Sequence, residues 1–341
     1  MTESPPDISL DEIRSLLHGI PGPDMDARTA TAERERQLTK PAGALGRLEE
    51  LSAWLATWQG RHPPRLDRPR VAVFAGNHGV AARGVSAYPA TVTAEMVANF
   101  SRGGAAVNQL CATFDAELRV YELALEYPTR DFTEAAAMDE ADCARAMTYG
   151  MMAVEDGIDL LCLGEMGIAN TTSAAALSMA LFGGAASDWT GPGTGVGGAR
   201  LEAKTRIVAE AVARHQDAAH DPLLVLCRLG GLELAAIAGA VIAARIARVP
   251  VLLDGFACTA AAAVLQQLDH HALDHCMAAH CSAEPGHRRL LRELGKVPLL
   301  DLDMRLGEGS GAAVALGILR AAVACHTGMA TFAEAGVSGP G

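Results

Sequence analysis

Short apolar runs alternate with longer helical stretches along most of the chain. Most runs are followed by a Gly-containing loop and then by an Ala-rich stretch long enough for a helix, such as 232–247 or 311–325. Continuous apolar strands that alternate with helices predict an α/β fold of the Rossmann-like type, with a mainly parallel sheet covered by helices on both faces. The candidate strands are residues 71–75, 118–123, 160–163, 223–227, 249–253 and 297–302.

The first 65 residues follow a helical pattern instead. Apolar residues from Leu48 to Trp58 recur at helical spacing, so a helix is expected to begin near Gly46 and to end before the Arg61-His62-Pro63-Pro64 segment. We therefore predict a helical N-terminal region over residues 1–65, which can pack with the C-terminal segment as a small domain. Residues 66–341 are predicted to form the parallel α/β catalytic domain.

Charge and hydropathy narrow the classes of partner. The formal net charge of −12 opposes binding to nucleic acid or to an anionic membrane, because neither polyanion would gain counterion-release energy. Apolar runs such as 223–227 are too short to span a bilayer. We therefore expect small-molecule substrates and neither a nucleic-acid nor a membrane partner. An anionic substrate would be held by local backbone N–H groups and a few cations.

The cysteines and the N-terminal residues predict a cytoplasmic location. The eight cysteines contain no C-x-x-C pair, and several lie inside apolar runs, which is typical of reduced core thiols. The acidic, proline-bearing residues 1–11 do not resemble a secretory signal.

The His- and Cys-rich segment from His271 to Cys281 is a candidate metal site. Two pairs, His271 with His275 and Cys276 with His280, are spaced by four residues, and Cys281 follows. The two pairs would point along different helix faces, whereas zinc needs three or four converging ligands. A solvated helix with buried thiols is therefore favoured, and no metal is assigned.

The loops after the strands carry the candidate site, because ligands of parallel sheets lie beyond the carboxyl ends of the strands. The loop from Gly164 to Thr172 combines Glu165, the bare backbone of Gly167, and the polar side chains of Asn170 and Thr171. Binding of phosphate or ribose at this helix N-terminus would explain the pattern. A side chain at Gly167 would then obstruct the ligand without unfolding the protein. An ordinary helix capped by Asn170 or Thr171 would explain the pattern as well.

Two further glycine-rich loops follow the same logic. Residues 191–198 formally contain G-x-G-x-x-G, but no convincing strand precedes them, so the dinucleotide interpretation is weak. Their backbone can donate to a phosphate before the helix that contains Lys204, and a plain loop is an equal alternative. Glu308 stands between two glycines at the same predicted edge, where it is either a functional carboxylate or a residue that compensates a helix dipole.

Seven motifs, taken in order from about residue 38 to residue 332, resemble the nicotinate-nucleotide:dimethylbenzimidazole phosphoribosyltransferase family. They are Leu38-Thr39-Lys40-Pro41 with Leu45-Gly46-Arg47-Leu48-Glu49, Gly76-Asn77-His78-Gly79-Val80 with Gly84-Val85-Ser86, Gly164-Glu165-Met166-Gly167-Ile168 with Asn170-Thr171-Thr172, Gly193-Thr194-Gly195, Leu253-Asp254-Gly255-Phe256, Ser282-Ala283-Glu284-Pro285-Gly286-His287, and Arg305-Leu306-Gly307-Glu308-Gly309-Ser310-Gly311.

The resemblance implies an activity and a set of roles. A member of this family moves phosphoribose from nicotinate mononucleotide to 5,6-dimethylbenzimidazole or a related base, in cobalamin lower-ligand assembly, without a cofactor and as a homodimer. It implies that Glu308 is the general base. The residues implied to bind substrate are Ser86, Glu165, Gly167, Asn170, Thr171, Gly193, Gly195 and Lys204.

The chain departs from the family pattern in the glycine-rich loops. Many members have Arg at the position of Pro192, acidic residues at Gly197 and Gly198, and Gly at Ala169. The backbone of Gly193 and Gly195 can still donate to a phosphate. The contacts made by the rest of that loop are therefore the least defined part of the expected site.

Two rival functions stay open on the residues alone. A Mg²⁺-dependent transferase that uses phosphoribosyl pyrophosphate would need adjacent acidic residues after a strand, and Val251-Leu252-Leu253-Asp254-Gly255 offers one. A non-catalytic nucleotide-binding module would share the fold.

Overall fold

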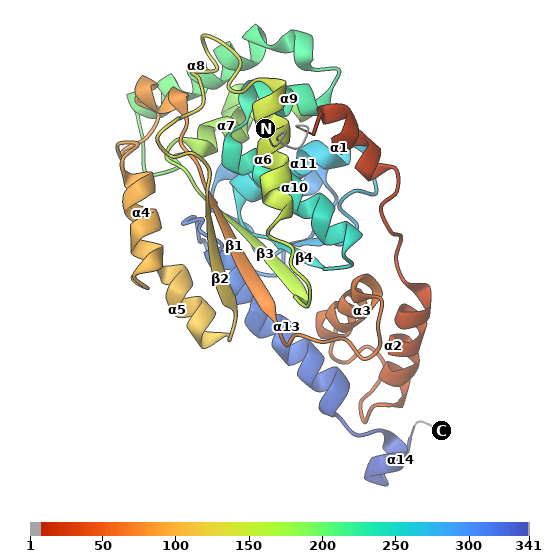
Figure 1. The fold of residues 1–341 in the computed structure, drawn as a ribbon. Coiled ribbons are helices and arrows are strands. Elements are labelled where there is room, and N and C mark those ends of the chain that lie inside the picture. Colours follow the sequence, from red (N-terminus) through yellow and green to blue (C-terminus); the bar gives the residue numbers. More distant parts are fainter. Residues whose placement is uncertain (1–7, 340–341) are drawn as a thin grey trace, which may run out of the picture.

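Five parallel strands form the centre of the structure (Figure 1). The computed structural model describes residues 8–339, so residues 1–7 of the predicted N-terminal region lie outside it. The strands pair in the order β2-β1-β3-β4-β5, and helices cover both faces, which confirms the predicted α/β fold. The strands are β1 (Pro69–Ala75), β2 (Glu117–Glu122), β3 (Leu160–Met166), β4 (Val251–Leu253) and β5 (Cys276–Ala278).

Helices make up most of the remaining structure. In chain order they are α1 (Leu10–Leu17), α2 (Met25–Gln37), α3 (Arg47–Gln59), α4 (Val92–Ser101), α5 (Ala106–Thr113), α6 (Glu140–Met151), α7 (Asn170–Phe182), α8 (Ala199–Arg214), α9 (Pro222–Leu229), α10 (Leu232–Ile246), α11 (Phe256–Leu268), α12 (Pro285–Glu293), α13 (Ser310–Gly328) and α14 (Phe332–Ala335), with short 3₁₀ turns η1 (Gly79–Arg83), η2 (Ala186–Asp188) and η3 (Gln216–Ala218).

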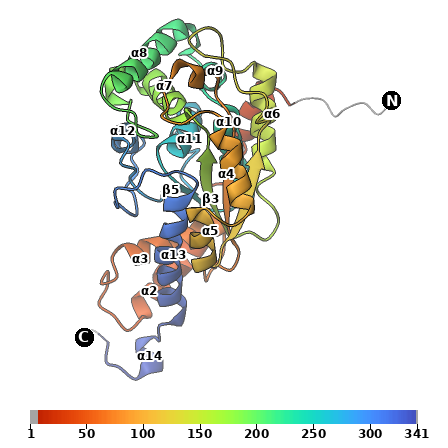
Figure 2. The ribbon, with the colours of Figure 1, turned by 90° about the vertical axis from the view of Figure 1, so that its left-hand side faces the viewer.

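Side chains of β1 alternate between two apolar cores. Val71 and Val73 pack with α3, α5 and α13, whereas Ala72 and Phe74 pack with the larger set of helices on the opposite face, including α6, α7 and α10. Figure 2 shows these layers from the side. Because both faces of the strand are buried, its sequence is continuously apolar from Val71 to Ala75 rather than alternating.

The structure corrects three details of the predicted pattern. Residues 223–227 belong to helix α9, not to a strand. Residues 297–302 contribute a single bridge, between Leu300 and His280, while the three-residue strand β5 was not predicted. The His- and Cys-rich segment is not a helix, because residues 270–275 form turns that lead into β5.

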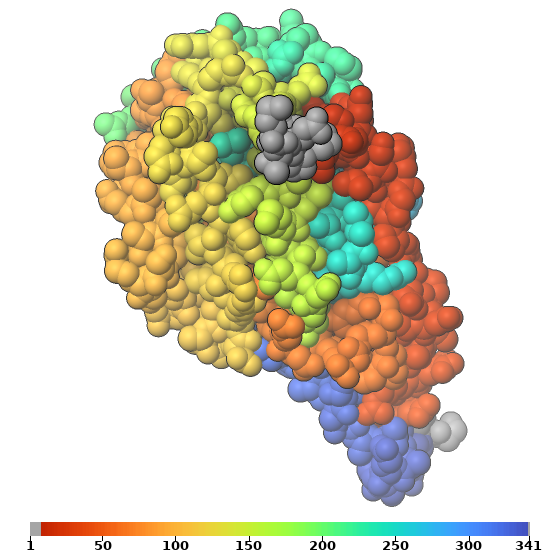
Figure 3. All heavy atoms as spheres, in the orientation of Figure 1, coloured from red at the N-terminus to blue at the C-terminus, as the bar shows by residue number. Residues whose placement is uncertain are grey.

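The N-terminal helices divide between two places. Helix α1 packs against α6, at the end of the molecule opposite to α2 and α3. Helices α2 and α3 pack against each other, and α3 packs on α13. Leu38 pairs with Thr331 in an antiparallel bridge, and the ring of His326 lies 2.6 Å from the carboxylate of Glu35. Figure 3 shows that α2 and α3, together with the C-terminal end of α13 and with α14, project as a lobe from the body of the molecule.

Helix α13 is the one helix in residues 8–339 that is long and apolar enough to be considered as a membrane span. It packs on β3, α3 and α5, and Ala312, Leu316 and Leu319 on it are fully buried. These contacts are those of a core helix in a folded α/β domain.

Candidate active site

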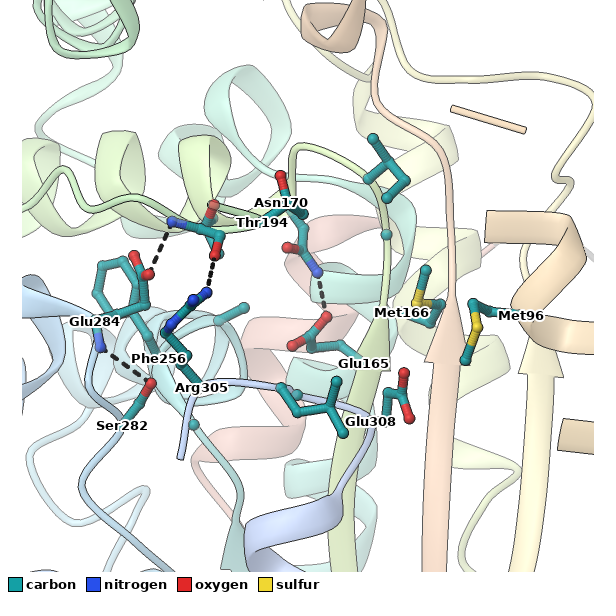
Figure 4. Close-up of a pocket in the computed structure, with 18 of the residues that line it drawn as sticks. Met96, Glu165, Met166, Asn170, Thr194, Phe256, Ser282, Glu284, Arg305 and Glu308 are labelled. Atoms are coloured by element: carbon teal, nitrogen blue, oxygen red, sulfur yellow. Dashed lines mark hydrogen bonds between the residues drawn. The ribbon is translucent and has the colours of Figure 1, made fainter. Parts of the chain in front are cut away.

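A cavity of about 530 Å³ opens at the carboxyl edge of the sheet. Strand β2 lies on one side of β1, and β3, β4 and β5 follow on the other side, so the strand order reverses between β1 and β3. Ligands of open parallel sheets bind at such a point. The cavity is large enough for a nucleotide-sized ligand. Residues after β3, β4 and β5 line it, together with α4 and the loop before α13 (Figure 4).

Most of the predicted site residues meet at this cavity. Six of the nine line it, and three lie outside its wall. Ser86 is outside but its hydroxyl lies 2.9 Å from that of Thr194, which does line the cavity. The six are Glu165, Gly167, Asn170, Thr171, Gly193 and Glu308, and the three are Ser86, Gly195 and Lys204.

Glu308 is held in an uncommon backbone conformation. Its φ is 63°, and the flanking Gly307 and Gly309 have φ values of 82° and 74°. Three successive residues in the left-handed region turn the chain sharply before α13. A Cβ at Gly309 would lie 2.8 Å from Val71, so this position also needs glycine for packing. The N–H of Glu308 donates to the carbonyl oxygen of Glu165 at 3.0 Å, which ties the loop to β3.

Two carboxylates of the cavity, those of Glu308 and Glu165, are hard to ionise. Burial, together with the negative charge of Asp254, raises the pKa of Glu308 to about 7. Burial also raises the pKa of Glu165 well above its usual range, assisted by the charges of Asp254 and Glu233. In Figure 4 both side chains lie on one side of the cavity, beside Met166 and Met96. A carboxylate with a pKa near 7 is suited to proton transfer at neutral pH.

The start of α7 is built around Ala169 rather than a capping side chain. Ala169 is the N-cap residue, with a φ of 80° that favours glycine, and no side chain caps the helix. Neither Asn170 nor Thr171 therefore has the capping role that the alternative interpretation required. The amide of Asn170 instead donates a short hydrogen bond to Glu165.

Thr171 and Lys204 support the glycine-rich loop from behind. The ammonium of Lys204 donates to the Thr171 hydroxyl and to the Gly191 carbonyl oxygen, each at 2.9 Å. A Cβ at Gly193 would lie 3.0 Å from the Lys204 nitrogen, so the loop backbone rests directly on this cation. Burial lowers the pKa of Lys204 to about 8, although the charge of Glu284 opposes the shift.

The opposite wall of the cavity comes from residues whose roles were not predicted. Glu284 accepts a hydrogen bond from the Gly193 N–H at 2.8 Å, and Arg305 donates to the Gly193 carbonyl oxygen at 2.8 Å. Burial raises the pKa of Glu284. Both residues were part of the motifs that carried the resemblance, and this membership was the available signal. Figure 4 shows them with Phe256 and Ser282 across from Glu165.

Gly167 is required by the protein itself. A Cβ at this position would lie 2.7 Å from the carbonyl oxygen of Gly76 and 3.3 Å from the carboxylate of Glu233. The expectation that a side chain here would obstruct only the ligand is therefore wrong, because the first atom it meets is backbone.

An apolar wall completes the cavity. Its members were not predicted to form a wall, because they come from separate elements. Met166, Ile168, Phe256 and Leu306 belong to the quoted motifs, whereas the other four belong to none. Tyr88 is 55% exposed and Leu306 is 56% exposed, which makes the mouth of the cavity apolar. A flat aromatic ligand would be compatible with such a wall. The apolar residues are Tyr88, Val92, Met96, Met166, Ile168, Phe256, Ala257 and Leu306.

Within residues 8–339, no three His, Cys, Asp or Glu side chains converge as metal ligands do. All eight cysteines are free thiols, and seven of them are buried. The chemistry that the cavity itself offers is proton transfer at Glu308 and binding of an anion by backbone and cationic groups.

Comparison with known proteins gives one consistent family. Residues 20–337 match a family model described as phosphoribosyltransferase. A nicotinate-nucleotide–dimethylbenzimidazole phosphoribosyltransferase from Rhizobium etli is 59% identical over 332 residues, which cover 97% of this chain and 98% of the relative. The enzyme of the same name from Brucella canis is 59% identical over 331 residues, with the same coverage. A crystal structure of CobT from Thermus thermophilus aligns with a TM-score of 0.87 and 43% identity, covering 92% of this chain and 100% of that one.

Proposed function

This chain belongs to the nicotinate-nucleotide–dimethylbenzimidazole phosphoribosyltransferase family, and from that premise we propose that Glu308 is the general base of its reaction. The enzyme transfers phosphoribose from nicotinate mononucleotide to 5,6-dimethylbenzimidazole or a related base, for cobalamin lower-ligand assembly. The products are nicotinate and an α-ribazole 5′-phosphate-type nucleotide. The observation that carries the proposal is a buried cavity carboxylate whose pKa is raised to about 7.

The chemistry needs a base rather than a metal. Nicotinate leaves C1 of the ribose as a neutral pyridine, because its ring nitrogen carries the positive charge beforehand. One benzimidazole nitrogen attacks C1, and the N–H on the other nitrogen becomes acidic as that bond forms. Glu308 accepts this proton, and general-base assistance of this kind contributes about 10²–10⁴-fold. Attack opposite the leaving group inverts C1 and gives the α-nucleotide.

The anionic end of the substrate belongs near the glycine-rich loop and α7. The start of α7 favours a phosphate, as helix N-termini do. The N–H groups of Gly193 and Gly195, which the sequence suggested as phosphate donors, already donate to the Glu284 carboxylate and to the Pro192 carbonyl oxygen, so the loop does not supply these two donors. The cation of Lys204 lies directly behind Gly193 and Thr171 and adds a positive field there. In this proposal Glu165 and Asn170, which line the cavity and are hydrogen-bonded to each other, contact the ribose hydroxyls. Ser86 acts through Thr194, the cavity residue that it contacts.

The proposal also covers the oligomeric state, the location and the domain organisation of the enzyme. The enzyme acts as a homodimer in the cytoplasm, without a nucleic-acid or membrane partner, and its eight free cysteines suit a reducing compartment. The part of the N-terminal region that contains α2 and α3 forms a small domain with the C-terminal segment beside the catalytic domain, whereas α1 belongs to the catalytic domain because it packs on α6. The bridge between Leu38 and Thr331 and the 2.6 Å hydrogen-bond contact between Glu35 and His326 support that division. Light scattering tests the dimer.

The proposed base is tested with Glu308→Gln, which keeps the side-chain size but cannot accept the proton. We expect kcat to fall by about 10²-fold or more while nicotinate mononucleotide still binds. Glu202→Gln on the exposed face of α8 is the matched control and should leave kcat unchanged. Turnover within a few-fold of the parent in a folded Glu308→Gln variant would exclude Glu308 as the base and make Glu165 the next candidate.

The same assay separates the metal-dependent alternative. Turnover should be unchanged in EDTA, because no step uses a metal ion. Activity lost in EDTA and restored by Mg²⁺ would favour a transferase that uses phosphoribosyl pyrophosphate.

A further inference from the structure

His280 is a buried histidine with no hydrogen-bond partner in the described residues. It follows β5, lines the cavity and is 2% exposed, and both of its ring nitrogens are sealed from solvent. An unsatisfied buried donor is costly, so native proteins keep few of them. The side chain therefore needs an explanation beyond packing.

The neighbouring histidine shows what a satisfied ring looks like. Nδ1 of His287 accepts from the N–H of Ser282 at 2.8 Å. The hydroxyl of Thr259 donates to the Gly255 carbonyl oxygen, so Nε2–H of His287 donates to that hydroxyl at 3.0 Å. His287 is thus held as one neutral tautomer by two partners. The two rings are 6.3 Å apart, yet His280 has neither contact.

The carboxylate of Asp254 lies close to the ring of His280. Nε2 of His280 lies 3.4 Å from Oδ1 of Asp254, and Asp254 is fully buried. A lone pair on Nε2 would repel the carboxylate, so the tautomer with Nε2–H facing Asp254 is favoured. The contact is longer than a good hydrogen bond, and contacts of this kind tighten when a substrate closes the site.

Asp254 in turn holds the loop that carries Glu308. Its two carboxylate oxygens accept hydrogen bonds from the N–H of Gly309 at 3.1 Å and of Ala312 at 2.9 Å. The His280 ring packs against the same turn, since a Cβ at Gly311 would lie 2.0 Å from its Cδ2. Ring, carboxylate and loop therefore form one packed unit.

We propose that His280 is a positioning residue for the base: its Nε2–H donates to Asp254, which fixes the loop of Glu308 and reduces the negative charge that Glu308 faces. This inference rests on the proposed function only where it concerns catalysis. The physical coupling of His280 to Glu308 is tested separately from the catalytic role of Glu308.

Other ionisable groups around this unit do not supply the same compensation. Glu165 on β3 faces both Asp254 and Glu308 and adds negative charge. Cys162 on β3 and Cys258 on α11 also face Asp254, and burial raises the pKa of both thiols well above the usual range, so neither is charged at neutral pH. His287 has a pKa lowered to about 3 by burial and is neutral.

The coupling is measured by ¹³C NMR titration of Glu308 in protein labelled at glutamate side chains. The Glu308 signal is identified by its absence in Glu308→Gln. In His280→Leu, Asp254 keeps the N–H donors of Gly309 and Ala312 but loses the N–H of His280, so more of its negative charge acts on Glu308 and protonated Glu308 is favoured. We expect the Glu308 midpoint to rise by about 0.5–1 pH unit. In the kinetic assay the acid limb of kcat should move upward by the same amount, with little change in KM for nicotinate mononucleotide.

Two further variants complete the test. His280→Gln keeps an N–H donor and should give a smaller upward shift. His215→Leu removes another buried histidine, whose Nε2 lies 2.8 Å from the Phe132 carbonyl oxygen, away from the cavity, and should leave the midpoint in place. A Glu308 midpoint in His280→Leu equal to that of the parent would overturn the proposal. If His280→Leu does not fold, the absence of any shift in His280→Gln overturns it instead.

The outcomes for the base and for His280 are distinct. Loss of turnover in Glu308→Gln together with an unshifted midpoint in His280→Leu retains the base and rejects the positioning role. A shifted midpoint with normal turnover in Glu308→Gln supports the coupling and rejects the base.

Discussion

Lys204→Met separates the stability of the protein from its ability to bind substrate. Lys204 is 1% exposed, and its ammonium donates to Thr171 and Gly191 directly behind the glycine-rich loop. Methionine has a similar length and no charge. The variant therefore removes one buried cation and little volume.

The pKa of Lys204 sets the expected size of the effect on stability. Burial lowers this pKa from 10.5 to about 8, and a difference of about 2.5 units corresponds to roughly 3.4 kcal/mol at neutral pH. Because the folded protein binds the proton more weakly, this cost is present below pH 8 and disappears as the pH rises from about 8 to 10.5. Methionine removes the cost but leaves two acceptors without a donor, at about 1–3 kcal/mol each. The two effects nearly cancel, so Tm at pH 7 should change by only a few degrees.

Substrate binding should respond far more strongly. Without the cation behind Gly193, the phosphate of nicotinate mononucleotide loses a Coulomb attraction that acts through the loop, about 1.5–3 kcal/mol for separations of about 6–11 Å at an effective dielectric constant of about 20. KM should rise by roughly 10- to 100-fold. In the parent, KM should also rise above pH 8, as Lys204 loses its proton, and this rise should be absent from the variant.

Thermal unfolding at pH 7 and pH 9.5, with KM measured across the same range, tests both parts. Lys296→Met is the control, because Lys296 is a half-buried lysine that also donates to two carbonyl oxygens, those of Leu273 and Cys276, away from the cavity. It should leave KM unchanged. The reasoning would be refuted by an unaltered KM in Lys204→Met, or by a parent protein that gains no stability relative to the variant between pH 7 and pH 9.5.

Two other predictions follow from the site. Because the pKa of Glu308 is about 7, kcat/KM should fall about tenfold per pH unit below that pH, and a profile that is flat down to pH 5 would show that Glu308 is not the titrating base. Gly167→Ala should lower the free energy of unfolding by about 1–3 kcal/mol, because its Cβ would lie 2.7 Å from the Gly76 carbonyl oxygen, whereas Gly197→Ala has open space around it and should leave denaturant unfolding unchanged.

The apolar pattern was enough to predict a parallel sheet but not every strand in it. Residues 223–227 are as apolar as a buried strand, and periodicity alone cannot distinguish such a run from a buried helix. The deciding signal was local: Asp221 caps the helix and Pro222 occupies its first turn. Strand β5 was not predicted, because its three residues, Cys276–Ala278, are too few to produce a recognisable hydrophobic pattern.

The site was predictable where a motif coincided with the sheet edge. Glu308 and Glu165 follow that logic, and both line the cavity. Tyr88 and Met96 reach it from α4 and the segment before it, and their part in the cavity depends on how α4 packs over the sheet. Lys204 was identified by resemblance, yet its position behind the loop rather than in the wall depends on packing that no local spacing reports.

The bridge between residues 38 and 331 has a consequence for synthesis on the ribosome. Arg34 donates to the carbonyl oxygen of His326, which is 292 residues further along the chain. At about 5–20 residues per second, translation separates these partners by roughly 15–60 s. Throughout that interval α2 and α3 exist without the α13 surface that covers them. The faces of Trp54 and Leu55 that pack in the same core as Leu316 are then exposed to chaperones or to other nascent chains, so slow translation of the last third of the message would lengthen the period in which the nascent protein can aggregate.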